Sequence, residues 1–426
     1  MFTKKQKILI QKLKTDSFYK DLILTFGGQV IVMLLAFILN KIVSNQYSVE
    51  VFGTYNLIKR FISVISFVIL AAQGIAIPKF VAESNAIGDE NKTECYMITS
   101  LEIIVFFFII TTGIICCFSN TFAKIIFGDV TARKFLIPSC LYAFGSALIT
   151  YVYSFYRGIN KFVEYNVINI IMQVGTIFIC LVITGDLLKV YYAWSGFLLI
   201  YGGIEIVKCY IKNHFSLKNL KNKMFALPIL LHYSLPRIPG EFILFAYNLV
   251  PLAIISNRFN LRDVGYFSAA ISINSIITPL FSLVGTILLP LVSKSKVDNT
   301  GNQIKRKIKY LGIIYLLIGI VSVMFICCFG KIVLIVLFSK DYIECMPLVK
   351  LTILSIIPNA FYLLLRNPID GISDFPYNTI CLIISFIIYV VMLMLANTVE
   401  MCAIAMFISY LFLGGLSLIV WIRISA

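Results

Sequence analysis

Long runs of apolar residues, separated by short polar segments, extend along the whole chain. Each run is about as long as the roughly 20 apolar residues that a helix needs to cross a bilayer. The twelve runs lie at 22–43, 58–80, 97–118, 135–156, 165–184, 190–208, 227–256, 266–292, 310–330, 346–365, 377–396 and 400–422. This pattern predicts an all-α polytopic membrane protein with about twelve transmembrane helices.

One run differs from the others in length and in its helix-breaking residues. The run at 227–256 is longer than a single crossing requires and contains Pro236, Pro239 and Gly240. Proline removes a backbone donor and clashes with the preceding turn, so we expect a kink or a break in this helix.

The composition agrees with a membrane protein and argues against several other classes. Hydrophobic residues make up 60% of the 426 residues, charged residues only 13%, and the mean hydropathy is +0.94. A soluble domain has about a quarter charged residues, so a cytosolic enzyme, a secreted disulfide scaffold and a disordered chain are all disfavoured. The eleven cysteines include no C-x-x-C pair, and the chain has two histidines, so we expect no metal site and no cofactor.

The net charge of +16 follows from the placement of the basic residues. Lys and Arg gather between the apolar runs, and about twice as many lie on the side of the N-terminus as on the opposite side. Cytoplasmic loops of membrane proteins carry the excess of Lys and Arg, so we expect both termini in the cytoplasm. The expected surroundings are therefore membrane lipids, with no nucleic-acid partner.

Two stretches of sequence resemble each other at a spacing of about half the chain. Residues 42–55 read IVSNQYSVEVFGTY, and residues 254–267 read IISNRFNLRDVGYF. The same offset of 212 residues pairs Gly53 with Gly265 and Pro78 with Pro290. Further similarities lie at nearly the same offset and in chain order. This favours an internal duplication over chance similarity between apolar sequences.

A duplication of six helices implies a particular architecture. An even number of helices in each half makes both halves enter the membrane from the same side. We therefore expect two parallel six-helix bundles related by a pseudo-twofold axis along the membrane normal. The predicted domains are 1–208 and 227–426, joined by a cytoplasmic linker at 209–226. Two bundles that can move relative to each other are the typical architecture of a transporter.

Several segments at the ends of the predicted helices resemble a known family. They are NKIVSNQYSVEVFGTYNL from residue 40, AAQGIAIPKFVAES from residue 71, YRGINKFVEYN from residue 156 and DVGYFSAA from residue 263. Together they resemble polysaccharide-export proteins of the multidrug/oligosaccharidyl-lipid/polysaccharide exporter superfamily, and among these the O-antigen or capsule repeat-unit flippases of the Wzx type. The lipid II flippases, which have two further C-terminal helices, fit less well because this chain stops at Ala426.

The resemblance implies a MATE-like fold and a function in lipopolysaccharide or capsule synthesis. Such a protein is a flippase of the bacterial cytoplasmic (inner) membrane. By alternating access it moves an undecaprenyl-diphosphate-linked oligosaccharide from the cytoplasmic to the outer leaflet. A polysaccharide polymerase and a chain-length regulator are the partners that this function implies.

Arg237 is the sharpest candidate for a substrate-binding residue. It lies about 10 residues into its apolar run, roughly 15 Å deep at helical rise. A guanidinium holds phosphate oxygens in a bidentate geometry, which suits a lipid diphosphate. The alternative is an internal pair with Glu241, four residues further on, that neutralises both charges.

Other polar residues within the apolar runs are further candidates, because charges inside a membrane usually face a cavity or a partner. Lys59 and Arg60 are predicted either to line an outward-facing mouth or to snorkel to the interface. Gln29 and Asn248 are polar companions that could contact substrate. Glu102, Glu205 and Glu241 are candidates for proton coupling, with structural pairing as the alternative for the first two.

Two other functions remain open on the sequence alone. A multidrug or cation exporter of the same superfamily would favour an acidic lining, whereas the runs contain slightly more bases than acids. A membrane-embedded glycan polymerase would need a long outer loop or a catalytic histidine, and neither is evident. The sequence has no G-x-x-x-x-G-K-[ST] motif for ATP hydrolysis, so we expect a transporter and not an enzyme.

Overall fold

The computed structural model describes residues 17–215, 225–235, 238–297, 301–373 and 375–425. Within these ranges, the side chains of 17–26, 86, 240–241, 279–280, 282–297, 301–304, 370–371 and 425 are not described. The described residues form helices joined by short connections, and no strand occurs among them. Nine of these helices are long and apolar enough to cross a membrane, and a bent pair would make a tenth crossing. The chain is a multi-pass membrane protein.

The helices of the first part of the chain are α2 (Ser17–Gln46), α3 (Val49–Leu70), α4 (Gln73–Ala86), α5 (Glu90–Cys117), α6 (Ser119–Phe127), η1 (Val130–Phe135), α7 (Leu136–Gly158), α8 (Phe162–Val182) and α9 (Leu187–Lys212). The second part contains α10 (Ala226–Ser234), α11 (Ile238–Arg258), α12 (Leu261–Val297), α13 (Gly301–Leu337), η4 (Lys340–Cys345), α14 (Met346–Ile353), α15 (Ile356–Ile372), α16 (Tyr377–Leu395) and α17 (Val399–Ser425). Every predicted apolar run coincides with a helix or a pair of helices, which confirms the fold class. The kink or break predicted within 227–256 falls at Pro236 and its neighbour, which lie outside the described residues, so it stays a prediction.

The second predicted helix, at 58–80, is wrong in its boundaries. The structure has α3 at Val49–Leu70, a break at Ala71 and Ala72, and then α4. Both alanines have positive φ, a left-handed conformation that interrupts a helix. The early start escaped the hydropathy pattern because the first turns of α3 are partly polar. Ser48 supplies a local start signal, since its hydroxyl accepts a hydrogen bond from the backbone N–H of Val51 at 3.4 Å.

The run predicted at 346–365 is also two helices. The segment Lys340–Ile353, which includes α14, and the segment Ile356–Ile369 of α15 meet at a bend of 46°. Pro358 lies in the first turn of α15, where the proline ring prevents the helix from continuing straight back into α14. The buried side chain of Asn274 holds this break, donating to the Thr352 carbonyl at 3.0 Å and to the Ser355 hydroxyl at 3.2 Å.

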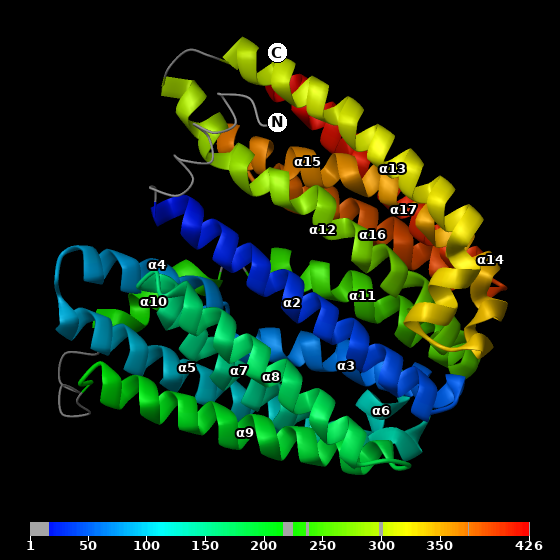
Figure 1. Cartoon of the computed structure of the whole chain (residues 1–426), viewed down its shortest axis with the longest axis horizontal. Helices are drawn as coiled ribbons and strands as arrows, with labels where there is room; N and C mark the ends of the chain where they lie inside the picture. Colours follow the sequence, from blue (N-terminus) through cyan, green and yellow to red (C-terminus); the bar gives the residue numbers. More distant parts are fainter. Residues whose placement is uncertain (1–16, 216–224, 236–237, 298–300, 374, 426) are drawn as a thin grey trace, which may run out of the picture. The chain divides into compact units, whose positions relative to one another are not determined.

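Contacts group the chain into two compact units. The first consists of residues 1–46, 61–123 and 130–239, and the second of residues 47–60, 124–129 and 240–426. In the first unit α7 packs against α4, α5, α8 and α9, and α7, α8 and α9 run side by side in Figure 1. In the second unit α15 packs against α12, α13, α16 and α17. The predicted division into domains 1–208 and 227–426 stays a prediction.

Residues related by the internal repeat meet in the second unit. A Cβ atom added to Gly53 would overlap the Leu261 carbonyl oxygen and lie 2.9 Å from the Gly265 nitrogen. A Cβ atom added to Gly265 would overlap the Val49 carbonyl oxygen. Each glycine thus packs against the residue four positions before the other, and Val49 and Leu261 are also 212 residues apart. Such reciprocal contact is what a local twofold axis produces, and it supports the duplication. The side chain of Pro290, in the other predicted pair, lies outside the described residues.

The predicted topology has a direct test. A reporter fused at residue 298 is expected to be active in the cytoplasm, and a reporter fused at residue 260 on the outer side, because Lys and Arg concentrate on the side of residue 298. Paired alkaline phosphatase and fluorescent-protein fusions measure both positions. The opposite pattern would invert the whole topology.

Candidate functional site

Lys59 and Arg60 lie in the middle of a membrane-crossing helix. Arg60 is about 11 residues, or roughly 16 Å, from the start of α3 at Val49. Both side chains are half-buried. The sequence placed them at the beginning of a helix, where snorkelling to the interface is easy; the corrected bounds of α3 remove that explanation. Two adjacent cations at this depth are costly unless a partner or a ligand compensates them.

Tyrosines surround these two cations within the second unit. The Lys59 ammonium lies 5.6 Å from the centre of the Tyr55 ring, within the range of a cation–π interaction. The phenols of Tyr55 and Tyr410 are neighbours of the Arg60 guanidinium. Tyr410 in turn lies 5.6 Å, centre to centre, from Tyr247. We call Tyr55, Lys59, Arg60, Tyr247 and Tyr410 the Arg60 site.

The Arg60 site is held by buried contacts behind it. Tyr247 of α11 shares a hydrogen bond of 2.9 Å with the Ser409 hydroxyl of α17, and its ring contacts Tyr389 of α16 at 5.8 Å. Among the side chains that the structure describes, no carboxylate forms an ion pair with Arg60. Tyr55 and Tyr247 are buried, so the arrangement offers a ligand the half-buried guanidinium of Arg60, which suits an anion, and the half-buried ring of Tyr410.

Three other predicted substrate residues have different surroundings. Gln29, on α2 in the first unit, donates a hydrogen bond of 2.8 Å to the Tyr165 hydroxyl of α8. Asn248 donates at 3.2 Å to the Leu244 carbonyl of its own helix. Arg237 lies outside the described residues, and so does the side chain of Glu241, so their substrate contact and their mutual pairing stay predictions.

The acidic candidates Glu102 and Glu205 also differ from each other. Glu102 is exposed on α5. Glu205 is buried on α9 and forms an ion pair of 2.8 Å with Lys208, the structural pairing that the sequence left open. Glu205 also lines a pocket of about 540 Å³ between α8 and α9. Among the described residues, no group of His, Cys, Asp and Glu side chains is arranged to hold a metal ion.

The sequence missed the tyrosines of the Arg60 site as functional residues. Tyr410 is in the last helix of the chain and Arg60 in an early one, and no local spacing connects them. Aromatic residues are frequent throughout, at 14% of the chain. No sequence signal separates these tyrosines from those that pack helices together.

Comparison with known proteins identifies the family. Residues 18–296 match the family described as "Polysaccharide biosynthesis protein". The chain belongs to this family. Its resemblance to polysaccharide-export proteins is thereby confirmed. No curated protein sequence is recognisably related to the chain.

Solved structures show that the fold is shared with transporters. An inward-facing multidrug resistance MATE family transporter of the MOP superfamily is 12% identical, with a TM-score of 0.79 over 95% of this chain and 98% of that one. The lipid II flippase MurJ, in an inward closed conformation, is 14% identical, with a TM-score of 0.75 over 95% of this chain and 89% of MurJ. A MATE in complex with MaL6 is 13% identical, with a TM-score of 0.68 over 98% of both chains. The chain therefore has the MATE-like fold of MOP superfamily transporters.

Proposed function

We propose that this protein is a flippase that moves an undecaprenyl-diphosphate-linked oligosaccharide from the cytoplasmic to the outer leaflet of a bacterial cytoplasmic membrane. The supporting observation is the Arg60 site, in which two cations lie among tyrosines in the middle of a membrane-crossing helix. The oligosaccharide is an O-antigen or capsule precursor, as membership of a polysaccharide biosynthesis family suggests.

The chemistry of the Arg60 site suits the proposed substrate. A lipid diphosphate is an anion that both cations attract, and the guanidinium of Arg60 can bind two of its oxygens at once. Tyr55 and Tyr247 are buried and support the site from behind, and the half-buried ring of Tyr410 offers amphipathic surface to the sugar next to the diphosphate. The polyprenyl chain stays in lipid, so the pathway has to accept only the polar head. A polymerase that consumes the flipped unit in the outer leaflet would lower its concentration there and so favour outward transport.

The second candidate is a multidrug exporter, since MATE transporters share the fold. The Arg60 site disfavours a cationic drug there. A monovalent cation 4 Å from a protein cation is repelled by about 4 kcal/mol at the effective dielectric constant of a protein surface. A membrane-embedded glycan polymerase is the least supported alternative, because the similar structures are named as transporters or flippases.

Reconstitution separates these functions. The purified protein is placed in vesicles with a fluorescent lipid-diphosphate oligosaccharide, and the sugar exposed to an impermeant oxidant is measured. We expect the protein to increase the exposed fraction beyond that in protein-free vesicles. Unchanged exposure, together with gradient-driven transport of a cationic dye, would establish the exporter instead.

A further inference from the structure

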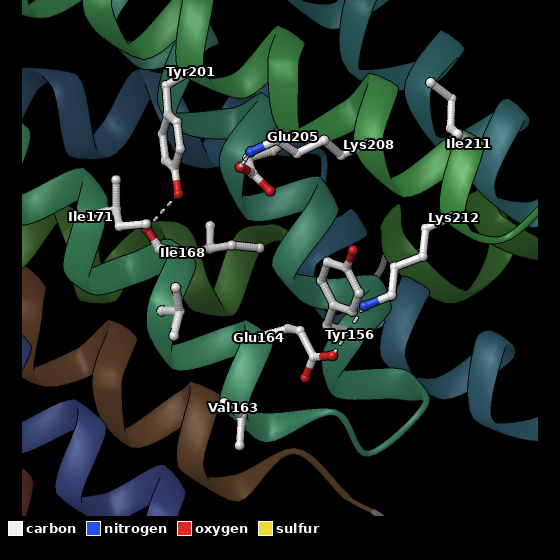
Figure 2. Close-up of a pocket in the computed structure, with 11 residues that line it drawn as sticks. Tyr156, Val163, Glu164, Ile168, Ile171, Tyr201, Glu205, Lys208, Ile211 and Lys212 are labelled. Carbon is white, nitrogen blue, oxygen red and sulfur yellow. Dashed lines mark hydrogen bonds and ion pairs between the residues drawn. The ribbon is translucent and has the colours of Figure 1, made fainter.

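A pocket opens between α8 and α9 in the first unit, and its lining divides into an apolar wall and a charged end (Figure 2). Its volume is about 540 Å³. None of its residues belongs to the Arg60 site, which lies in the second unit. The pocket is therefore a feature that the proposed function does not use.

The apolar wall follows one face of α8. Val163, Val167 and Ile171 recur every four residues and are 54%, 47% and 44% exposed. They extend over about 12 Å of helix, a length that matches several methylene groups of an extended hydrocarbon chain. Ile211 of α9, which is 70% exposed, also lines the pocket. In a membrane-crossing helix such a surface faces hydrocarbon.

The charged end lies where α8 begins and α9 ends. Lys208 pairs with Glu205 at 2.8 Å, and Lys212 pairs with Glu164 at 3.3 Å, as Figure 2 shows. The Lys212 ammonium also lies 5.9 Å from the centre of the Tyr156 ring. Two bases and two acids make the formal charge of this end zero.

The two charges of the tighter pair differ in depth. The side chain of Glu205 is 11% exposed and that of Lys208 is 63% exposed. Lys208 can therefore rotate toward a ligand, whereas the Glu205 carboxylate stays in the pocket. A buried carboxylate that loses its cation is strongly destabilised, so a ligand that attracts Lys208 has to bring a positive charge of its own.

We propose that this pocket binds a membrane phospholipid whose headgroup carries both a phosphate and a primary ammonium, as in phosphatidylethanolamine. The phosphate accepts hydrogen bonds from Lys208 and Lys212, and the ammonium donates to Glu205 and Glu164. One acyl chain lies along Val163, Val167 and Ile171. The positive-inside bias predicts the cytoplasmic leaflet for this site.

The same charges disfavour other lipids. A trimethylammonium headgroup has no N–H to donate to a carboxylate. A purely anionic headgroup would take Lys208 and leave the Glu205 carboxylate without a cation. The polyprenyl diphosphate of the proposed substrate is anionic and is disfavoured for the same reason.

Lipid titration of the purified full-length protein tests the proposal. We expect phosphatidylethanolamine to raise the midpoint of thermal unfolding in detergent at about tenfold lower concentration than phosphatidylcholine or phosphatidylglycerol with the same acyl chains. Native mass spectrometry is expected to show the same preference. A preference for phosphatidylglycerol would indicate a basic lipid surface only, and equal effects of all three would indicate acyl-chain binding only; either result overturns the proposal.

Matched variants locate the effect. Glu205→Gln keeps the shape of the side chain and removes its charge, so it is expected to abolish the preference for phosphatidylethanolamine over phosphatidylcholine. If Glu205→Gln does not fold, the more exposed Glu164→Gln tests the same headgroup contact. Glu83→Gln is the control, because Glu83 pairs with Lys79 at 3.9 Å on an exposed surface and should retain the preference. If the preference for phosphatidylethanolamine persists in folded variants at both Glu205 and Glu164, the proposal is overturned. The flipping assay tests the proposed function separately from this lipid preference.

Discussion

Replacement of Arg60 by alanine is expected to reduce transport of the lipid-linked oligosaccharide roughly 10- to 100-fold. Hydrogen bonds to charged groups contribute about 1.5–3 kcal/mol, and each 1.4 kcal/mol corresponds to about a factor of ten. Arg60→Lys keeps the charge but lacks the planar fork, so its loss should be intermediate. Surface polysaccharide in cells that express only the variant, and flipping in vesicles, are the measurements.

A control separates the loss of binding from a general loss of positive charge. Arg133, an exposed residue of η1, has Asn120 as a polar neighbour at 3.5 Å. Arg133→Ala should transport at the normal rate, and all variants should reach normal abundance in the membrane. If Arg60→Ala transports like the unmodified protein, the diphosphate does not bind at the Arg60 site. A variant that loses transport together with abundance would show a structural role for Arg60 instead.

Replacement of Gly53 or Gly265 by alanine is expected to destabilise the protein by at least about 1–3 kcal/mol, the usual cost of overpacking a tight contact. In both positions the added methyl group would overlap a backbone carbonyl oxygen of the opposite helix. Backbone atoms cannot rotate away as a side chain can, so α3 and α12 would have to separate. Thermal unfolding of the purified variants in detergent should show a lower midpoint for each.

Gly113 provides the control for these substitutions. It lies within α5, and a Cβ atom added there would have no other heavy atom within 4 Å. Gly113→Ala should leave the midpoint unchanged or raise it, because alanine favours a helix over glycine by about 1 kcal/mol. Normal stability of both Gly53→Ala and Gly265→Ala would show that the close approach of α3 and α12 is unnecessary.

The two cations of the Arg60 site show how a helix boundary changes the interpretation of a residue. With a helix starting at residue 58, Lys59 and Arg60 are interfacial and need no explanation. With α3 starting at Val49, both lie deep in the crossing. Hydropathy did not find this start because Glu50, Gly53 and Asn56 lower the local average. Gly53 is favourable in α3 because it allows the close contact with α12, and this contact is non-local.

Glu205 and Lys208 illustrate a signal that the sequence contained. Residues three apart on a helix are neighbours, so the ion pair between them follows from spacing alone once α9 is assigned. The pairing of Glu164 with Lys212 is different, since it joins two helices. The first pair could be predicted from the sequence, whereas the charged end of the pocket as a whole could not.

The sequence by itself determined the membrane class, the approximate number of helices, the internal duplication and the family resemblance. These properties are local or repetitive. The length of an apolar run matches the thickness of a bilayer, and a duplication leaves similar residues at one constant sequence separation. The tertiary structure alone decided where α3 begins, how α14 and α15 bend around Asn274, and which tyrosines surround Arg60. Those features depend on packing between helices far apart in the chain, where shape and polar contacts between neighbours outweigh the hydropathy of any single segment.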